Sequence, residues 1–269
     1  CSSQWPVLEV CWSTMKIWVV FILAIVSTSA SPISGRIFQG SDANPGEFPY
    51  QVGMRISRDN AQYWCGGVMI SETWVLTAAH CLAGADVFTL LLGATDTTKP
   101  ERTFTLIAAD VIIHENWDSY TMSNDIALIK VPNPGYSEHI LPVTLPRIES
   151  KDYSTYDHEY ALATGWGLMG DAGDHAERLQ VSYLPILSND VCALFFPEDD
   201  INGAKICVAT WSGGSSCLGD SGGPLVHVES NVLIGISSSI PLEGCQRGMP
   251  AVYTRVTYHR QWIRQNSGV

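Results

Sequence analysis

Basic side chains are scarce in this sequence of 269 residues. Lys and Arg together number 15 against 27 Asp and Glu, so the formal net charge is −12. A surface that holds nucleic acid needs clustered cations opposite the phosphates. The sequence contains no such cluster, which argues against a nucleic-acid partner.

Long hydrophobic runs are lacking as well. The run at residues 17–26 has ten uncharged apolar residues, whereas a membrane-spanning helix needs about 20. Met15 and Lys16 precede the run and small residues follow it, a pattern typical of a signal peptide. We therefore expect a signal peptide at residues 15–30, a secreted protein and no membrane anchor. Residues 1–14 are then interpreted as upstream sequence that is not translated, the alternative being a longer, unusual leader.

Motifs for metal ligation and N-glycosylation are also absent. The sequence has no Cys-x-x-Cys motif, no His pair at ligand spacing and no Asn-x-Ser/Thr motif. Structural metal sites and glycan attachment depend on such spacings. We therefore expect no metal, no other cofactor and no N-linked glycan.

The chain does contain many short apolar runs, separated by Gly, Pro, Asn and Asp. This pattern is typical of an all-β sandwich or barrel. Residues 256–266 place Tyr258, His259, Trp262 and Ile263 near one face, which predicts a C-terminal helix. The Pro-containing segment 132–159 is a candidate link between two lobes. The expected strands are residues 64–70, 74–79, 87–92, 104–108, 126–131, 160–164, 179–185, 205–209, 224–228 and 232–237.

Six of the eight cysteines lie beyond the expected leader. An even number in a secreted chain indicates three disulfides, for which 15 connectivities exist. Pairing each cysteine with its nearest neighbour in the chain is the simplest choice. The six are Cys65, Cys81, Cys192, Cys207, Cys217 and Cys245.

Three polar residues stand in distinctive settings. His80 follows an apolar run in TAAHC, Asp125 opens one in NDIALIK, and Ser221 lies in GDSGGP. A serine hydroxyl is a poor nucleophile unless an imidazole takes its proton and a carboxylate orients that imidazole. The three residues are therefore a candidate catalytic triad; the alternative is a capping or turn role for each.

The motifs TAAHC, NDIALIK, TGWG, LPILSNDVC and GDSGGPL, in this order, resemble those of the trypsin/chymotrypsin-like serine endopeptidases. The resemblance runs from Ile37 to the C-terminus, and it is nearest to arthropod digestive chymotrypsin-, elastase- and collagenase-like proteases. It implies two six-stranded antiparallel β-barrels with the active site between them, and a C-terminal helix. Residues 37–269 would form this protease domain, and residues 31–36 an activation propeptide.

The resemblance also implies roles for single residues. Ser221 would be the nucleophile, His80 the general base and then acid, and Asp125 the orienting carboxylate. The backbone N–H groups of Gly219 and Ser221 would form the oxyanion hole, and Ser238 would hydrogen-bond the triad aspartate. The family supports the neighbour pairing of the cysteines. The other six histidines (114, 139, 158, 175, 227 and 259) are expected in surface or core roles.

The Arg36-Ile37 junction resembles the activation site of this family. Cleavage there would create an ammonium on Ile37 that can turn inward and pair with Asp220, since a buried charge is tolerated only when it is paired. An activating trypsin-like protease is then an expected partner. The alternative is that Arg36 is merely an exposed basic residue.

The expected specificity pocket departs from that of trypsin. Ser215 occupies the floor position, where a basic-specific enzyme would have Asp. Ile240 and Ala251 replace two wall glycines, which favours small or medium aliphatic side chains. If Ile240 points away, a chymotrypsin-type pocket for large apolar residues survives instead.

We therefore expect a monomeric, secreted, zymogen-activated serine endopeptidase with a digestive role, acting on proteins and peptides. Protein protease inhibitors are further candidate partners. A venom, salivary or host-modulating protease is the alternative. A non-catalytic binding homologue is disfavoured, because such proteins usually lose a triad member.

Overall fold

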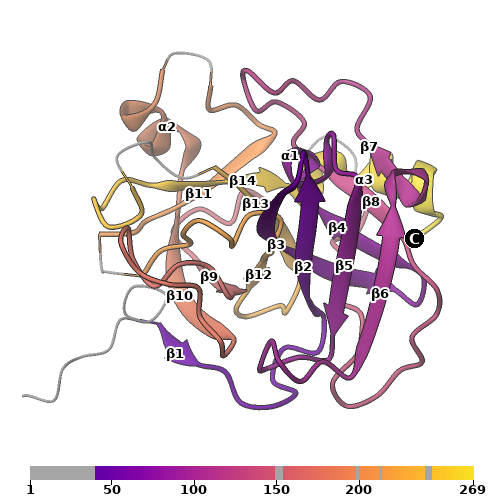
Figure 1. Cartoon of the computed structure of the whole chain (residues 1–269). Coiled ribbons are helices and arrows are strands. Elements are labelled where there is room, and N and C mark those ends of the chain that lie inside the picture. Colours follow the sequence, from indigo (N-terminus) through magenta and orange to yellow (C-terminus); the bar gives the residue numbers. More distant parts are fainter. Residues whose placement is uncertain (1–39, 149–153, 198–199, 212–213, 240–243) are drawn as a thin grey trace, which may run out of the picture. The chain divides into compact units, whose positions relative to one another are not determined.

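The computed structural model describes residues 40–148, 154–197, 200–211, 214–239 and 244–269. These residues form two antiparallel β-sheets and three α-helices (Figure 1). The expected leader at residues 15–30, the residues before it and the propeptide at 31–36 lie outside the described residues, as do Arg36, Ile37 and Ile240.

The first sheet curls back upon itself. Its strand order is β6-β5-β2-β3-β4-β8-β7, and β6 continues into β7 through a single 3₁₀ turn, η2 (Ala108–Asp110). Strands β6 and β7, at the two ends of the sheet, therefore follow each other directly in the chain. The chain bends at η2, and β6 pairs with β5 while β7 pairs with β8. The strands are β2 (Gln51–Arg58), β3 (Ala61–Ser71), β4 (Trp74–Thr77), β5 (Val87–Leu92), β6 (Arg102–Ile107), β7 (Val111–Ile113) and β8 (Ala127–Lys130).

The second sheet closes into a barrel. Its order is β1-β10-β11-β14-β13-β12-β9, and a further pairing of β9 with β10 joins six strands in a ring, with β1 added at β10. Its strands are β1 (Ser41–Asp42), β9 (Tyr160–Gly165), β10 (Gln180–Leu187), β11 (Lys205–Val208), β12 (Pro224–His227), β13 (Leu233–Ser239) and β14 (Ala251–Arg255).

The prediction of an all-β protein built on two β-barrels with a C-terminal helix is confirmed. Each sheet encloses its own buried apolar core, which includes Met54 and Leu90 in the first and Ile206 and Leu225 in the second. The chain passes from one sheet to the other between β8 and β9, which is where the Pro-containing segment was expected to link two lobes.

The helices are few, and two of them are single turns. They are α1 (Ala79–Leu82), α2 (Asn189–Cys192), which runs into the 3₁₀ turn η3 (Ala193–Phe195), and α3 (Val256–Ser267). The buried face of α3 carries His259, Trp262 and Ile263 as predicted, but Val256 in place of Tyr258, which is 53% exposed. None of the helices in the described residues has the length and apolar character needed to cross a bilayer.

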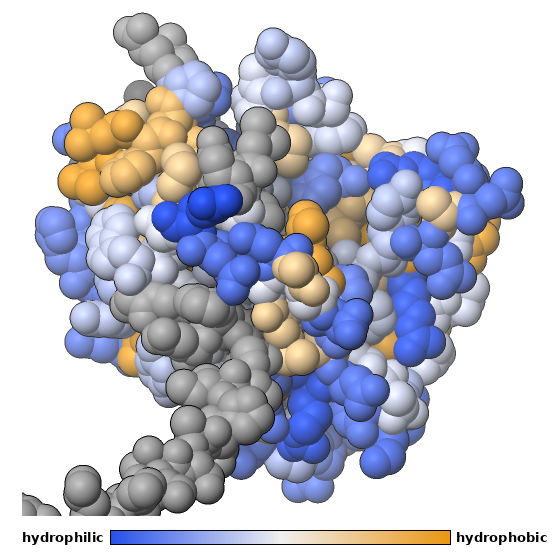
Figure 2. All heavy atoms as spheres, turned by 60° about the vertical axis from the view of Figure 1, so that its left-hand side comes forward, coloured by the Kyte–Doolittle hydropathy of each residue, from blue (hydrophilic) through white to orange (hydrophobic). Residues whose placement is uncertain are grey.

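Hydrogen bonds join the segments of the two sheets. Thr164 Oγ1 on β9 donates to Gln51 Oε1 on β2 at 2.6 Å, and the Gly66 amide on β3 donates to the Ser221 carbonyl at 2.7 Å. The face seen in Figure 2 is mostly hydrophilic, with an orange group over α2 and η3, where Leu194 and Phe195 are exposed.

Candidate active site

His80 and Asp125 are brought together by two neighbouring strands. His80 lies in α1, directly after β4, and Asp125 lies just before β8. Thr77 at the end of β4 pairs with Ala127 at the start of β8, so the segments beyond that pair meet. The His80 imidazole Nδ1 lies 2.8 Å from Asp125 Oδ2, and the His80 amide donates to Asp125 Oδ1 at 2.9 Å.

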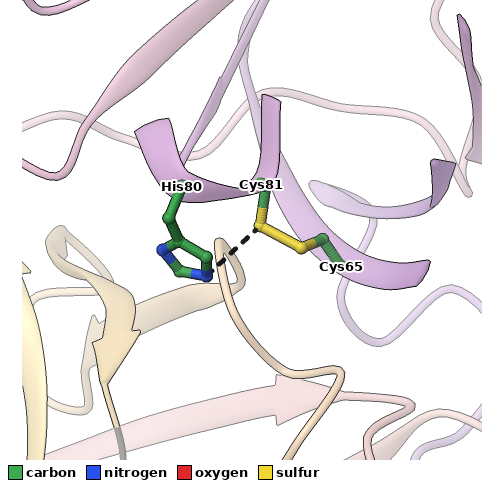
Figure 3. Close-up of side chains that lie close together, drawn as sticks. All are labelled: Cys65, His80 and Cys81. Atoms are coloured by element: carbon green, nitrogen blue, oxygen red, sulfur yellow. Dashed lines mark hydrogen bonds between the residues drawn. A yellow bond between two sulfur atoms is a disulfide. The ribbon is translucent and has the colours of Figure 1, made fainter. Parts of the chain in front are cut away.

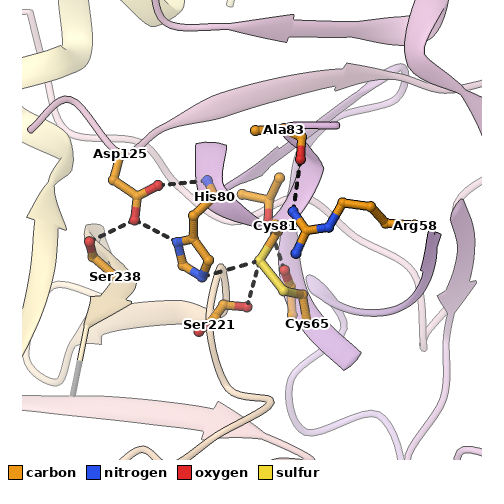
Figure 4. The surroundings of a disulfide bond; sticks show 10 residues. Arg58, Cys65, His80, Cys81, Ala83, Asp125, Ser221 and Ser238 are labelled. Atoms are coloured by element: carbon orange, nitrogen blue, oxygen red, sulfur yellow. Dashed lines mark hydrogen bonds and ion pairs between the residues drawn. A yellow bond between two sulfur atoms is a disulfide. The ribbon is translucent and has the colours of Figure 1, made fainter. Parts of the chain in front are cut away.

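The Asp125 carboxylate is fully buried and fully partnered. Ser238 Oγ, from β13 of the other sheet, donates to Asp125 Oδ2 at 2.7 Å (Figure 4). Burial alone would raise the pKa of Asp125, but the charge and hydrogen bonds of His80 and the Ser238 hydroxyl outweigh it and hold this pKa below its usual value. An ionised Asp125 fixes the imidazole with Nδ1–H toward the carboxylate, which leaves Nε2 as the base.

Ser221 lies in a tight turn between the Cys217 segment and β12. Gly219 and Gly222, on either side of it, have φ angles of +97° and +79°, conformations that side-chain-bearing residues rarely adopt. The turn is held by the Gly66 amide on the Ser221 carbonyl and by the Gly222 amide on the Ser237 carbonyl, each at 2.7 Å. Figure 4 shows Ser221 beside the imidazole of His80. No hydrogen bond joins their side chains in the described structure, as is common in substrate-free sites.

Some backbone N–H groups at this turn, among them those nearest the Ser221 side chain, have no acceptor within the described part of the chain. Among the described residues, the amides of Gly219 and Ser221 donate to no backbone or side-chain oxygen, whereas the Asp220 amide between them donates to the Cys217 carbonyl at 3.0 Å. Backbone donors near a site are normally satisfied. A pair left open beside a serine can receive an oxyanion.

The disulfide between Cys65 and Cys81 lies against the imidazole (Figure 3). Cys81 Sγ is 3.7 Å from His80 Nε2 and 3.6 Å from the Ser221 carbonyl oxygen. A disulfide sulfur carries no proton, so these are packing contacts that limit the movement of α1.

Two further disulfides join Cys192 to Cys207 and Cys217 to Cys245, so the six cysteines of the described residues all pair with their chain neighbours. Sulfurs engaged in disulfides cannot act as thiolate ligands. This removes the metal-binding capacity of the two groups with ligand-type side chains near one another, Cys65-His80-Cys81 and Asp171-Cys217-Cys245.

Asp220 is a buried carboxyl group held by two amides. The Gly167 amide donates to its Oδ1 and the Cys217 amide to its Oδ2, both at 2.8 Å. Burial raises the pKa of Asp220 to about 6, although these amides and His175 act in the opposite direction. A Cβ built on Gly165 would lie 2.0 Å from Asp220 Oδ1, so only glycine leaves room for this carboxyl.

The described part of the expected specificity pocket is buried and uncharged. Ser215 is 2% exposed and its hydroxyl donates to the Ser216 carbonyl at 2.7 Å. Ala251 is fully buried on β14, which pairs with β13 at Ser239. Ile240, the third expected pocket residue, lies outside the described residues.

One residue near the triad had no motif to mark it. His175 was expected in a surface or core role; its Nδ1 lies 3.1 Å from the Trp166 carbonyl oxygen, and a Cβ on Gly219 would come within 2.5 Å of its Cε1. The imidazole thus occupies the space in which a side chain at Gly219 would lie. Its position depends on a loop between β9 and β10, which no local pattern reveals.

The comparisons with known proteins agree with this geometry. The Trypsin family model matches residues 37–263. A collagenase of Hypoderma lineatum is 38% identical over 95% of this chain and 99% of its own. Serine protease 1 of Drosophila melanogaster is 39% identical over 91% of both chains, and brachyurin of Leptuca pugilator is 36% identical over 87% of this chain and 99% of its own.

A solved collagenase structure superposes with a TM-score of 0.80 at 36% identity, and covers 86% of this chain and 99% of that one. The resemblance to arthropod proteases of this type is therefore confirmed. The chain belongs to the trypsin family of serine proteases, which are hydrolases.

Proposed function

We propose that this chain is a secreted digestive endopeptidase that hydrolyses peptide bonds with Ser221, His80 and Asp125. The observation that carries the proposal is the line of contacts from Ser238 through Asp125 to the imidazole of His80, beside a serine turn with two open amides. An imidazole held in this way is the base that a serine nucleophile requires.

In the proposed reaction, Ser221 Oγ attacks the scissile carbonyl carbon while His80 Nε2 takes the hydroxyl proton. The carbonyl oxygen becomes an oxyanion, which the amides of Gly219 and Ser221 stabilise. His80 then gives its proton to the leaving amine, and an acyl-enzyme remains. A water molecule, deprotonated by His80, hydrolyses this ester and restores the serine.

Activation by cleavage between Arg36 and Ile37 is part of the proposal. Its support is the state of Asp220, a carboxyl group 3% exposed whose pKa is raised to about 6. A new ammonium group on Ile37 would supply the partner that a charged Asp220 needs inside the protein. An external trypsin-like protease would make the first cut.

The proposed preference is for small-to-medium aliphatic or large apolar side chains before the cleaved bond, rather than basic ones. Ser215 contributes no negative charge to pair with Lys or Arg, and Ala251 adds a methyl group where a glycine would leave space. Pocket volume discriminates by only about 1–3 kcal/mol per methylene, so the cleavage pattern should be broad. A relative named collagenase is compatible with a protein substrate.

The proposal is tested by treating the purified chain with trypsin and profiling cleavage in a peptide library, with a fluorophosphonate to mark the nucleophile. We expect labelling at Ser221 and cleavage after apolar residues. An Arg36→Gln variant should stay inactive under the same treatment. Cleavage mainly after Arg or Lys would contradict the pocket assignment, and full activity of Arg36→Gln would contradict the activation step.

A further inference from the structure

A hollow of about 330 Å³ lies on one side of Ser221, next to His80. Its lining comes from the β2–β3 hairpin of the first sheet and from His175, Leu218 and Gly219, and the rings of Trp64 and His175 lie 6.4 Å apart in it. Its lining residues are Arg58, Gln62, Tyr63, Trp64, Cys65, His80, Cys81, His175, Leu218, Gly219 and Ser221.

The lining of this hollow indicates which side of a substrate would reach it. Under the proposed reaction, the side chain before the cleaved bond enters the pocket that includes Ser215 and Ala251. Neither of these residues lines the hollow, while His80, which must protonate the leaving amine, does. A peptide chain running past Ser221 therefore places the residues after the cleaved bond in this hollow, which Arg58 helps to line.

The charge of this hollow is opposite to that of the whole protein. The sequence carries a formal net charge of −12, yet the lining residues include an arginine and no carboxylate. Among the described residues, no ion pair joins Arg58 to an acidic side chain, although Asp59 and Asp86 lie at the same end of the strand. The guanidinium charge is thus uncompensated by a contact.

Arg58 is also held in place. Its Nη1 donates to the Ala83 carbonyl at 2.8 Å, and its Cζ lies 4.8 Å from the centre of the Tyr63 ring. Figure 4 shows the guanidinium extending toward the disulfide of Cys65 and Cys81, which itself touches Ser221. One of its five N–H donors is used in the described structure, so the others remain for a ligand.

We propose that the hollow beside Arg58 is a leaving-group subsite that selects polypeptides with Asp or Glu shortly after the cleaved bond. A guanidinium matches the two oxygens of a carboxylate, and ordering by Ala83 and Tyr63 reduces the entropy lost on binding. The inference rests on the proposed endopeptidase function and names a substrate class for the same site.

The test compares quenched peptides that differ only in Glu against Gln at each of the first three positions after the cleaved bond. A half-exposed ion pair should favour Glu by about two- to fivefold in kcat/KM at one of these positions. The preference should decrease at 0.5 M NaCl, because salt screens such pairs. In Arg58→Gln the ratio should fall to about one.

Arg102→Gln is the matched control. Arg102 lies on β6 of the same sheet and loses the same charge, but its guanidinium donates to the carbonyls of Pro134 and Glu101 and does not line the hollow. Its Glu-to-Gln ratio should equal that of the wild type.

A ratio near one in the wild type, or an unchanged ratio in Arg58→Gln, overturns the subsite while leaving the endopeptidase function intact. No cleavage of any peptide, together with no fluorophosphonate labelling of Ser221, overturns the endopeptidase function and the subsite with it.

Discussion

The raised pKa of Asp220 predicts that the free energy of unfolding of the uncleaved chain depends on pH. Its carboxyl group is 3% exposed and is held by the amides of Gly167 and Cys217. Burial raises the pKa of Asp220 from 3.8 to about 6. Because the folded chain then keeps a proton that the unfolded chain loses, its free energy of unfolding should fall as the pH rises between these two values.

The pKa difference sets the size of this effect. About two pH units at 1.36 kcal/mol each correspond to about 3 kcal/mol of unfolding free energy, fully present below pH 4 and lost above pH 6. Asp220→Asn should remove this dependence. Asn cannot accept hydrogen bonds from both amides, so the variant carries a cost at every pH, and the comparison concerns the slope rather than the absolute stability.

The assay is urea unfolding of the uncleaved chain, with disulfides intact, at several pH values from 4 to 7.5. All proteins carry Ser221→Ala so that none can cleave itself, and Asp174→Asn, which removes an exposed carboxylate, serves as the control. From pH 4 to 7.5, the free energy of unfolding of the Ser221→Ala protein should fall by about 3 kcal/mol more than that of its Asp220→Asn variant. The Asp174→Asn control should behave like the Ser221→Ala protein. Equal slopes in the parent and Asp220→Asn would refute the reasoning. In the chain cleaved after Arg36, pairing with the new ammonium should abolish the loss.

Two further changes probe the triad surroundings. Gly219→Ala forces a side chain into a φ of +97° and a Cβ to within 2.5 Å of His175 Cε1, so its amide must move. Its kcat should fall by roughly 10²–10³-fold, and a value within threefold of the wild type would contradict the oxyanion role. Ser238→Ala removes a hydrogen bond to a buried carboxylate, worth about 1.5–3 kcal/mol. It should lower kcat by roughly tenfold or more with KM little changed, and steady-state kinetics giving an unchanged kcat would show that Ser238 does not position Asp125.

The triad could be predicted from the sequence because each member lies in a short segment whose conformation or burial requires particular residue types. The turn at Ser221 needs Gly219 and Gly222 at positive φ, and such glycines are visible in a motif. The strand that follows Asp125 is a continuous apolar run, because β8 is buried on both faces. These are local requirements, and a single sequence records them.

The sequence pattern missed four strands, β1, β2, β7 and β14. Two of them, β2 and β14, were missed because they bury polar side chains. In β2, Gln51 interrupts the apolar run, yet it is buried and accepts a hydrogen bond from Thr164. In β14, Thr254 and Arg255 likewise interrupt the apolar run although both are buried. Thr254 Oγ1 donates to the Asp125 carbonyl at 2.8 Å. A polar residue satisfied by a partner far along the chain cannot be distinguished from an exposed one in the sequence.

That Arg58 and His175 line the hollow beside Ser221 could not be predicted from the sequence, for a related reason. Arg58 belongs to a hairpin of the first sheet and His175 to a loop of the second, and they share one hollow only because the two sheets pack at the triad. Neither residue lies in a motif, since neither requires a special backbone conformation. The same packing also joins Ser238 to Asp125.

The central claim, that this chain hydrolyses peptide bonds with Ser221 activated by His80, is tested most directly by kcat/KM on a peptide that the activated wild type cleaves. Ser221→Ala and His80→Ala should each reduce it by about 10⁴–10⁶-fold, with folding unchanged by circular dichroism. Activity of Ser221→Ala within tenfold of the wild type would contradict the claim.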